Sequence, residues 1–541
     1  VRLLVAGAHH RFLPFRWPDS HCSPMSVDFF TRRQRSSLGA ASKESISEKN
    51  NAPLVIVIAG PTGVGKSAVA ASLCGANRAS KILCSNGNTD AVGHIVSADS
   101  VQAYNGVQVG ANKPTEEERN MTPHHLIDIV DANNYAYNAA EWMEDAILVV
   151  NDLVGRCPLE GTDADGSKDG RTQERRENIR KNMHAVMQSG GENTGQPILP
   201  VVVGGTMMYL QWLVHGRPDA PRPSAEALEK AATVLSKFRS SDSSSTLSDG
   251  TKTSSPGWDA AVNHVSSLGP LFKARVDKLY GNDWYRLRRI LEVGYTVEGG
   301  NATDDQINAL YSGQRYGGIG TLGFDVRCFF LCPDDRMKHA ELIDKRCEDM
   351  ILRGLLRETT DLSLSGGLPD NGQPARAIGY RQALDYLRRK DAKNEDADTL
   401  NGFMDNFAAV TRRYAKKQMQ WFRRDKSFLF VPVSLSESPD NRIEDAADII
   451  LSMCLLSRED YEKELYSPDA KDVNEVQGGS LPLSAKTKLE NENQAKGMKF
   501  FIGKRHKIIE GTAEYGGVIR EADACTKQMQ EFLDLLERAE T

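Results

Sequence analysis

Residues 54–67, Leu-Val-Ile-Val-Ile-Ala-Gly-Pro-Thr-Gly-Val-Gly-Lys-Ser, give the clearest indication of how the chain folds. The first six form an apolar, β-branched run of strand length. The remainder matches the pattern G-x-x-x-x-G-K-[ST], whose fixed positions are Gly60, Gly65, Lys66 and Ser67. The next residues, Ala-Val-Ala-Ala-Ser-Leu, suit a helix. A strand, a glycine-rich loop and a helix start, in this order, predict a phosphate-binding loop in an α/β fold.

The loop also predicts chemistry. Glycines allow a tight turn in which backbone N–H groups converge on an anion at the positive end of a helix. Lys66 would reach the outermost phosphate, and the Ser67 hydroxyl would bind Mg²⁺, the cofactor we expect. The alternative is a turn that binds nothing, which the complete motif disfavours. The loop does not indicate whose phosphate binds, but its expected ligands are Gly60, Pro61, Thr62, Gly63, Val64, Gly65, Lys66 and Ser67.

The composition is that of a globular chain. It has 541 residues, enough for two to four domains, and 40% of them are hydrophobic. No run of 18 or more apolar residues occurs, so no membrane-spanning helix is expected. The formal net charge of -6 means that nucleic-acid binding would need a local basic patch. The nine cysteines include no C-x-x-C pair, which disfavours a zinc site or a disulfide framework.

Changes in composition divide the chain into five segments. Residues 1–50 are rich in arginine and serine and poor in acids, which is typical of a transit peptide and predicts a mitochondrial or other organellar protein. A disordered leader on a cytoplasmic protein is the alternative. The other segments are the first part of an α/β core at 51–216, a helical insertion at 217–324, the second part of the core at 325–435 and a polar C-terminal extension of unknown role at 436–541.

Two further predicted strands end in polar or glycine-rich residues. His94 to Ala98 is followed by Asp99, and Ile198 to Val203 by a Gly-Gly-Thr turn. Repeated strand–turn–helix units indicate a parallel sheet, and ligands of such sheets bind outside the carboxyl ends of the strands. Asp99 is therefore predicted to face the bound phosphates. A helix N-cap is the alternative for this aspartate.

Other polar stretches are predicted to be structural. His124 and His125, with Asp128 nearby, raise the alternative of a metal site, but adjacent side chains point in different directions. Histidines satisfied within a loop or core are the better interpretation. Three polar insertions are expected to be loops and a fourth stretch a linker, at 75–93, 155–196, 236–257 and 462–497, respectively.

Basic residues gather in two predicted helices. In 282–293, Leu287, Ile290 and Leu291 share one face, and arginines occupy the rest. In 407–424, aromatic residues line one face, and six basic residues with no acid occur between Thr411 and Arg424. Such runs are usually solvated surface, but interleaved aromatics in an acidic chain favour a phosphate-rich polymer.

Seven blocks, in order between residues 54 and 430, together resemble the tRNA dimethylallyltransferase (tRNA isopentenyltransferase) family. The resemblance implies a P-loop NTPase-like parallel sheet core with an inserted helical subdomain that binds tRNA. The blocks are Gly-Pro-Thr-Gly-Val-Gly-Lys-Ser at 60–67, Ser-Ala-Asp-Ser-Val-Gln-Ala-Tyr at 97–104, Pro-His-His-Leu-Ile-Asp at 123–128, Val-Gly-Gly-Thr-Met-Met-Tyr-Leu at 203–210, Arg-Leu-Arg-Arg-Ile-Leu-Glu-Val at 286–293, Arg-Ala-Ile-Gly-Tyr-Arg-Gln at 376–382 and Thr-Arg-Arg-Tyr-Ala-Lys-Lys-Gln-Met-Gln-Trp-Phe-Arg at 411–423.

The resemblance implies transfer of a dimethylallyl group from its diphosphate to the exocyclic amine of an adenine beside the tRNA anticodon. Asp99 matches the family's general base, while Lys66, Thr62 and Arg376 match positions near the reacting diphosphate. The implied partners are tRNA and dimethylallyl diphosphate, with no membrane, and we expect a monomer. The positions that match tRNA contacts are Asp99, Ser100, Val101, Gln102, Thr206, Tyr285, Arg286, Leu287, Arg288, Arg289, Arg412, Lys416, Lys417, Gln418 and Arg423.

Three other functions remain alternatives. An adenylate isopentenyltransferase would share the phosphate loop and the acid, but a free nucleotide needs no extended basic grip. A P-loop small-molecule kinase would use ATP and leave the basic-aromatic helix without a task. A non-catalytic RNA-binding protein is disfavoured by the intact Lys66, Ser67 and Asp99. Many eukaryotic family members carry a C-terminal zinc finger, but no cysteine pair precedes Lys504-Arg505-His506-Lys507, so no zinc is expected.

Overall fold

The computed structural model describes most of the chain after residue 51. The described residues are 52–84, 90–132, 137–156, 170–189, 196–218, 224–239, 256–277, 279, 283–296, 315–370, 372–389, 400–465, 483–495, 497–501 and 515–540. The expected leader at 1–50, most of the 236–257 insertion and the basic stretch at 504–507 lie outside these residues. No helix among the described residues has the length and apolar character needed to cross a membrane.

A six-stranded parallel sheet forms the centre of the fold, in the order β3-β2-β4-β1-β7-β8. The sequence predicted four of its strands: β1 (Leu54–Ala59), β2 (Val92–Ala98), β4 (Ile198–Gly204) and β7 (Asp325–Pro333). It did not predict the two edge strands, β3 (His124–His125) and β8 (Phe428–Val433). Pro432 argues against a central strand, but an edge strand tolerates proline.

Both faces of the sheet are covered, and the central strand shows why. Val55, Val57 and Ala59 of β1 point into one buried cluster, and Ile56 and Ile58 into another. Strand side chains alternate between faces, so an uninterrupted apolar run is what a strand buried on both sides requires. All five residues are fully buried.

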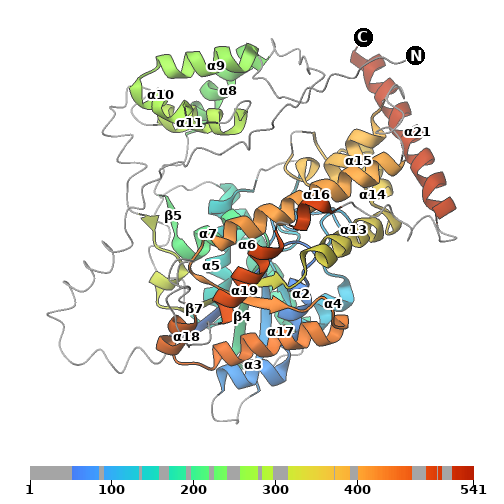
Figure 1. Cartoon of the computed structure of the whole chain (residues 1–541). Helices are drawn as coiled ribbons and strands as arrows, with labels where there is room; N and C mark the ends of the chain where they lie inside the picture. Colours follow the sequence, from blue (N-terminus) through green and yellow to red (C-terminus); the bar gives the residue numbers. More distant parts are fainter. Residues whose placement is uncertain are drawn as a thin grey trace, which may run out of the picture. The chain divides into compact units, whose positions relative to one another are not determined.

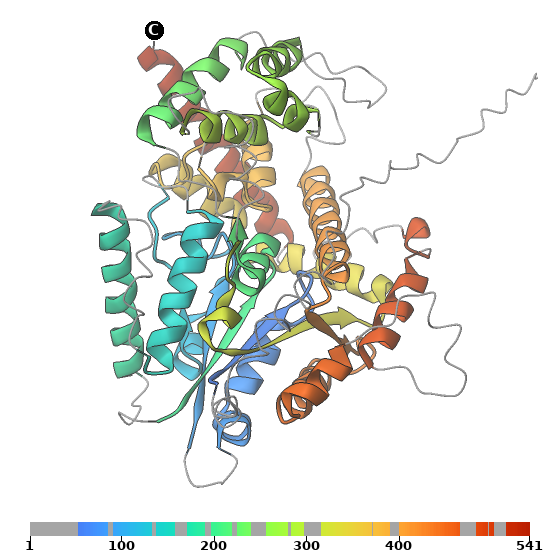
Figure 2. The same cartoon turned by 90° about the vertical axis from the view of Figure 1, so that its left-hand side faces the viewer.

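The larger buried cluster includes side chains from helices that are drawn in Figures 1 and 2. On this face α5 packs on α7, α13 on α16, and α14 on both α15 and α21. The helices that contribute to it are α5 (Ala139–Leu153), α6 (Gly170–Ser189), α7 (Met207–His215), α13 (Arg336–Leu352), α14 (Leu355–Leu364), α15 (Tyr380–Leu387), α16 (Leu400–Arg423) and α21 (Tyr515–Glu540).

The opposite face is covered by α2 (Lys66–Cys74), α3 (Ala76–Leu83), α17 (Pro439–Cys454) and α18 (Arg458–Leu465). Here α17 packs on α2 and on β8. α19 (Leu483–Gln494) lies against β8, and its Ser484 hydroxyl accepts a 3.0 Å hydrogen bond from the Phe430 N–H. Helices of the polar C-terminal segment therefore pack directly on the sheet.

Three predictions of loop or linker were wrong for the parts that the structure describes. The 75–93 insertion contains α3, where Arg78 pairs with Glu444 and Asp448 of α17. The 155–196 insertion contains α6, and the 462–497 linker contains α19. The buried face of α6 consists of Arg175, Ile179 and Met183, at positions i, i+4 and i+8. Because the first of these residues is charged, the sequence lacks the apolar periodicity that would have predicted a helix. Arg175 is buried because Asp145 of α5 pairs with it at 2.9 Å.

The predicted helical insertion is confirmed as a group of helices with its own core. It contains α8 (Ala225–Arg239), α9 (Pro256–Ser267), α10 (Pro270–Val276) and α11 (Trp284–Thr296). Trp258, Leu287 and Leu291 belong to the core they share. At the ends of the insertion, β5 (Arg217–Pro218) pairs with β6 (Arg315–Tyr316) in an antiparallel ladder.

Candidate functional site

Strand register brings three loops together at the carboxyl edge of the sheet. Gly204 of β4 is the register partner of both Ala59 of β1 and Ala98 of β2. The phosphate loop, Asp99 and the Gly205-Thr206 turn therefore all begin from the same row of the sheet. Gly204 is needed there, because a Cβ would lie 2.2 Å from the Ala98 carbonyl oxygen. The three loops at the edge predicted to bind ligand therefore begin at one place in the fold.

The loop after β1 has the backbone of an anion-binding turn. Gly63 and Gly65 have φ values of 80° and 99°, which side chains other than glycine rarely adopt. Gly65 is the N-cap of α2 and has no side chain, and no side chain in the described part of the chain caps the first N–H groups of the helix. The Lys66 ammonium donates to the Pro61 carbonyl at 2.9 Å, which folds its side chain back over the loop.

Charges around Lys66 come from two directions. The pKa of Lys66 is lowered to about 7: desolvation by burial lowers it most, the Arg346 guanidinium on α13 also lowers it, and the Asp99 carboxylate opposes both. Lys66 and Asp99 are thus close enough to interact, although 33 positions of sequence separate them. A bound polyanion would favour the protonated lysine.

The Asp99 side chain accepts hydrogen bonds from the backbone N–H groups that follow it, as the N-cap alternative predicted in part. Its Oδ1 accepts hydrogen bonds from the N–H groups of Val101 (2.8 Å) and Gln102 (3.3 Å). Oδ2 has no hydrogen-bond partner within the described ranges. One oxygen therefore fixes the turn while the other stays available, so capping and catalysis are compatible.

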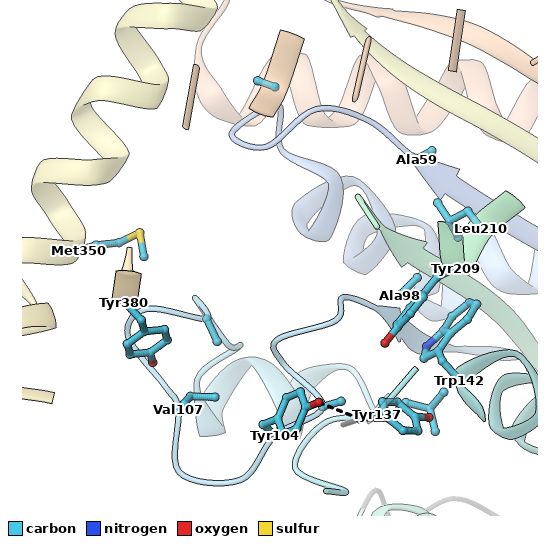
Figure 3. Close-up of a cluster of buried hydrophobic side chains, with 14 of the residues drawn as sticks. Ala59, Ala98, Tyr104, Val107, Tyr137, Trp142, Tyr209, Leu210, Met350 and Tyr380 are labelled. Carbon is cyan, nitrogen blue, oxygen red and sulfur yellow. Dashed lines mark hydrogen bonds between the residues drawn. The ribbon is translucent and has the colours of Figure 1, made fainter. Parts of the chain in front are cut away.

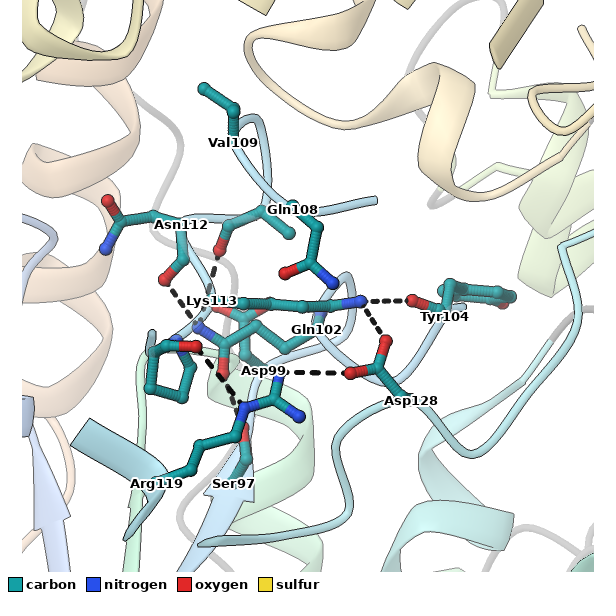
Figure 4. A network of polar contacts seen from close by, with 12 residues as sticks. Ser97, Asp99, Gln102, Tyr104, Gln108, Val109, Asn112, Lys113, Arg119 and Asp128 are labelled. Carbon is teal, nitrogen blue, oxygen red and sulfur yellow. Dashed lines mark hydrogen bonds and ion pairs between the residues drawn. The ribbon is translucent and has the colours of Figure 1, made fainter. Parts of the chain in front are cut away.

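The turn after Asp99 is tied to its neighbours. The Thr206 hydroxyl accepts from the Ser100 N–H at 3.1 Å. Gln102 accepts from Ser97 and donates to the Asn112 carbonyl at 3.1 Å, so its amide group is committed to the protein. Figure 4 shows the continuation of this network, in which Lys113 points to the Tyr104 carbonyl and to Asp128.

A buried aromatic cluster lies beside Ala98, at this edge of the sheet (Figure 3). Trp142 stacks on Tyr209 with ring centroids 4.6 Å apart, and its indole N–H donates to the Ser97 carbonyl at 2.9 Å. Tyr104 accepts from the Tyr137 N–H at 2.9 Å. The Trp142 N–H and the hydroxyls of Tyr104 and Tyr137 are all hydrogen-bonded, so these buried rings make a rigid base for the Asp99 turn.

Thr62 is held on both sides of its peptide group. Its N–H donates to Gln418 Oε1 at 2.9 Å, and its carbonyl accepts from His339 Nε2 at 3.0 Å. Gln418 also donates to the Gly205 carbonyl at 2.9 Å and is only 1% exposed. The expected tRNA contact at Gln418 is therefore replaced by a structural role: this residue joins the phosphate loop to the Gly205-Thr206 turn.

The basic residues of α16 fall into two groups. Arg412 pairs with Asp344, and Arg423 bonds to Asn491 at 3.1 Å and pairs with Glu492 at 3.3 Å, so both arginines already have protein partners. Lys416 and Lys417 are exposed. The lysines are the better candidates for contacts with a polyanion.

The candidate residues of α11 differ in the same way. Leu287 is fully buried in the core of the helical insertion, so the expected tRNA contact at this position is corrected. Arg286, Arg288 and Arg289 have exposed side chains and pair within their own helix region, with Asp283 or Glu292. Nothing is described for the side chain of Tyr285.

The structure gives the burial of three further candidates, Val101, Ser67 and Arg376. Val101 is partly buried against the large core cluster, and Ser67 is exposed at the start of α2. Arg376 is exposed in the short helix Pro374–Arg376, and no described contact joins it to Lys66 or Asp99.

The interpretation of the paired histidines as structural is confirmed. His125 Nε2 lies 2.9 Å from His94 Nδ1, and burial lowers the pKa of His125 to about 3. No group of three or more His, Cys, Asp or Glu side chains within the described ranges could hold a metal.

Sequence reasoning missed two residues that shape the site. His339 holds Thr62, as described above. Glu358 of α14 accepts from the N–H groups of Val109 and Gly110, both at 2.9 Å, and from the Tyr380 hydroxyl at 2.8 Å. Both residues lie on helices more than 200 positions after the segments they hold, and no local pattern could have identified them.

Comparisons with known proteins give consistent matches. A family model described as IPP transferase matches residues 102–159 and 180–425. The chain is 31% identical to tRNA dimethylallyltransferase 9 of Arabidopsis thaliana over 424 residues, which cover 72% of this chain and 73% of that protein. It is 28% identical to the tRNA dimethylallyltransferase of Protochlamydia amoebophila, with coverage of 72% and 87%.

Solved structures also match, at lower identity. A eukaryotic dimethylallyltransferase acting on tRNA is 20% identical, with a TM-score of 0.46 and coverage of 83% of this chain and 100% of that one. The full-length tRNA isopentenylpyrophosphate transferase of Bacillus halodurans is 22% identical, with a TM-score of 0.40 and coverage of 76% and 98%.

The family match spans more than half of the chain, and the Arabidopsis relative is matched over most of its own length. The kinase, adenylate isopentenyltransferase and non-catalytic alternatives are not favoured by these matches. The chain is a prenyltransferase that belongs to the IPP transferase family.

Proposed function

We propose that the protein transfers a dimethylallyl group from dimethylallyl diphosphate to the exocyclic 6-amino group of the adenine immediately 3′ of a tRNA anticodon. The observation that carries the proposal is the shared register of Ala59, Gly204 and Ala98, which sets a phosphate loop beside Asp99. Neighbouring loops then perform the two parts of this reaction, which are binding of the leaving group and removal of a proton.

The reaction breaks the bond between the allylic carbon and the diphosphate oxygen and forms a bond from that carbon to the adenine nitrogen. Negative charge grows on the diphosphate as the first bond breaks. The N–H groups of the loop and the Lys66 ammonium are placed to stabilise this charge. Asp99 Oδ2 accepts the proton that the amine loses, while Oδ1 stays bonded to the turn.

The residues of the loop fit a bound magnesium ion. Ser67 is exposed beside Lys66, and its hydroxyl is a hard oxygen ligand of the kind that Mg²⁺ takes together with water and substrate oxygens. The Ser67 hydroxyl would hold Mg²⁺ together with diphosphate oxygens, and the ion would neutralise charge on the leaving group.

Recognition of tRNA rather than a free nucleotide is supported by exposed basic side chains away from the loop. These include Lys416 and Lys417 of α16 and the arginines of α11. The target adenine must leave the stack of the anticodon loop to reach Asp99, because the reacting nitrogen has to meet the diphosphate-bound carbon.

Transfer of radiolabel from dimethylallyl diphosphate tests the proposal with the full-length chain. Acceptors are undermodified tRNA with an adenine 3′ of the anticodon, the same tRNA with guanine there, AMP and ATP. We expect label only in the first tRNA. Label in AMP or ATP would indicate an adenylate isopentenyltransferase, and ATP hydrolysis without label in any acceptor would reject prenyl transfer.

A further inference from the structure

Three consecutive backbone N–H groups, those of Gln108, Val109 and Gly110, converge on the carboxylate of Glu358 on α14. The Val109 and Gly110 nitrogens each lie 2.9 Å from a Glu358 oxygen. The Tyr380 hydroxyl donates to the same carboxylate at 2.8 Å. Successive N–H groups that point at one anion form a nest, and here a side chain of the same chain occupies it.

The carboxylate of Glu358 matches this site because all four of its partners are donors. An ionised carboxylate has two oxygens that each accept more than one hydrogen bond, and it has no donor of its own. Bonds to an ionised acceptor are about twice as strong as those between neutral groups. The loop also packs tightly, since a Cβ on Gly110 would lie 2.4 Å from Tyr380 Cζ. Glu358 therefore fixes the loop against α14 and α15.

The same loop holds the side chain of Gln102. The loop is closed by the Asn112 N–H, which donates to the Val109 carbonyl at 3.0 Å. Gln102 Nε2 donates to the Asn112 carbonyl at 3.1 Å and to the Ala111 carbonyl at 3.4 Å. The Gln102 N–H in turn donates to Asp99 Oδ1 at 3.3 Å, and Figure 4 shows these residues in one polar network. Gln102 therefore joins the loop to the Asp99 turn.

We propose that Glu358 is a positioning residue for Asp99, which acts through the loop at 108–112 and the side chain of Gln102. This inference rests on the proposed function, because Asp99 is the base of that reaction. A general base has to lie within hydrogen-bond reach of the proton that it accepts. A small displacement of the Asp99 turn therefore slows transfer of the prenyl group.

The phosphate loop is held by other side chains. Gln418 and His339 bond to the two sides of the Thr62 peptide group. A change at Glu358 should therefore alter the rate of transfer and leave the affinity for the diphosphate unchanged. The competing role is purely structural, in which Glu358 stabilises the fold but does not affect the rate of the folded enzyme.

Single-turnover transfer to tRNA separates these roles, with the full-length chain at a temperature where thermal unfolding shows each variant to be folded. Glu358→Gln places an NH₂ group against at least one backbone donor, whichever oxygen it replaces. Asp361→Asn, at an exposed position on the same helix, is the matched control and should behave as the wild type. For Glu358→Gln we expect transfer to slow about 10- to 100-fold, with an unchanged Kd for inorganic pyrophosphate at fixed Mg²⁺. A wild-type rate of transfer in this variant would overturn the inference.

A double-mutant cycle tests the path through Gln102. Gln102→Ala removes the bonds to the carbonyls of Ala111 and Asn112. In that background Glu358→Gln should slow transfer much less than it does in the wild type, because the two residues act in one chain of contacts. Independent effects, which would multiply in the double variant, would contradict the proposed path.

Amide hydrogen exchange gives a readout that does not depend on transfer. In Glu358→Gln the amides of Val101 and Gln102 should lose protection together with that of Gly110, while the Thr62 amide keeps its protection. Loss of protection at Gly110 alone would overturn the inference. If the wild type transfers no prenyl group but Val101 and Gln102 lose protection in the variant, the proposed function fails while the link from Glu358 to this turn stands.

Discussion

The carboxyl edge of the sheet and helix α16 both carry candidate functional residues, but they are built in opposite ways. At the edge, each residue follows directly from the end of a strand, as Asp99 follows β2. On α16, Gln418 is buried in the protein, whereas its neighbours Lys416 and Lys417 are exposed. A residue that directly follows a strand can be placed at the edge of the sheet from sequence alone. The exposure of a residue in a polar helix cannot be predicted in this way.

The difference has a simple physical origin. The carboxyl ends of parallel strands lie at one edge of the sheet. The residues that follow these strands therefore lie close together, whatever the sequences of the loops. A helix instead presents every third or fourth residue to the core, and a polar residue can occupy that stripe if it finds partners. Phe407, Ala415, Gln418 and Phe422 are all buried on α16, and Gln418 satisfies the Thr62 N–H and the Gly205 carbonyl.

Removing the loop's cation is expected to have the largest effect on activity. Lys66→Met takes away the ammonium that would stabilise the departing diphosphate, so kcat should fall by about 10²- to 10³-fold. Steady-state transfer to tRNA measures this. Lys81→Met, an exposed lysine of α3, is the control and should keep wild-type activity. A Lys66→Met enzyme with a normal kcat would mean that the edge does not perform the chemistry.

Changing Gln418 tests the link between the two regions. Gln418→Met leaves the Thr62 N–H and the Gly205 carbonyl without partners, at a cost of about 1–3 kcal/mol for each group. Gln418→Glu keeps the acceptor for Thr62 but places a buried carboxylate against the Gly205 carbonyl, so its loss should be at least as large. Urea unfolding and pyrophosphate affinity are the measurements.

The matched control for this prediction is Gln420→Met, since Gln420 is exposed two positions away on the same helix. If the Gln418 and Gln420 variants lose tRNA affinity equally and both keep their stability, then Gln418 contacts tRNA and its buried role is wrong.

The buried His339, which holds the phosphate loop, makes the free energy of unfolding depend on pH. Burial lowers the pKa of His339 to about 4, below the ordinary value of 6.5, so the unfolded chain binds more protons between these two values. Its contribution to stability is complete above pH 6.5 and is lost as the pH falls toward 4. At pH 5 the loss is about 2 kcal/mol.

Urea unfolding at pH 7 and pH 5 checks this sign. His339→Gln should lose less free energy of unfolding between the two pH values than the wild type does. His184→Gln, at an exposed position of α6, should behave as the wild type. An equal loss in all three proteins would show that His339 is not buried in its neutral form.

The smallest effects are expected on the exposed face of α16. Lys416→Ala and Lys417→Ala should each weaken tRNA binding modestly and lower the slope of log Kd against log salt by about 1. The KM for dimethylallyl diphosphate should not change. Lys81→Ala serves as the control. An unchanged salt slope in both variants would place the tRNA elsewhere.

The sequence predicted the parts of the molecule that depend on local pattern. It identified four sheet strands, the phosphate loop and the edge position of Asp99, because apolar runs and glycine turns act within a few residues. It missed β8, whose Pro432 is tolerated only at an edge, and α6, whose buried Arg175 depends on Asp145. His339 and Glu358 act across hundreds of positions, so only the folded chain reveals them.

The central claim is that the edge of the sheet separates diphosphate binding, by the loop, from proton removal, by Asp99. Asp99→Asn keeps an oxygen for the Val101 N–H and loses the base, and Asp90→Asn, at an exposed position before β2, is its control. Pyrophosphate affinity and single-turnover transfer to tRNA should be measured on the same preparations. We predict wild-type affinity with transfer slowed by about 10²- to 10⁴-fold in Asp99→Asn. Transfer at the wild-type rate would contradict the account.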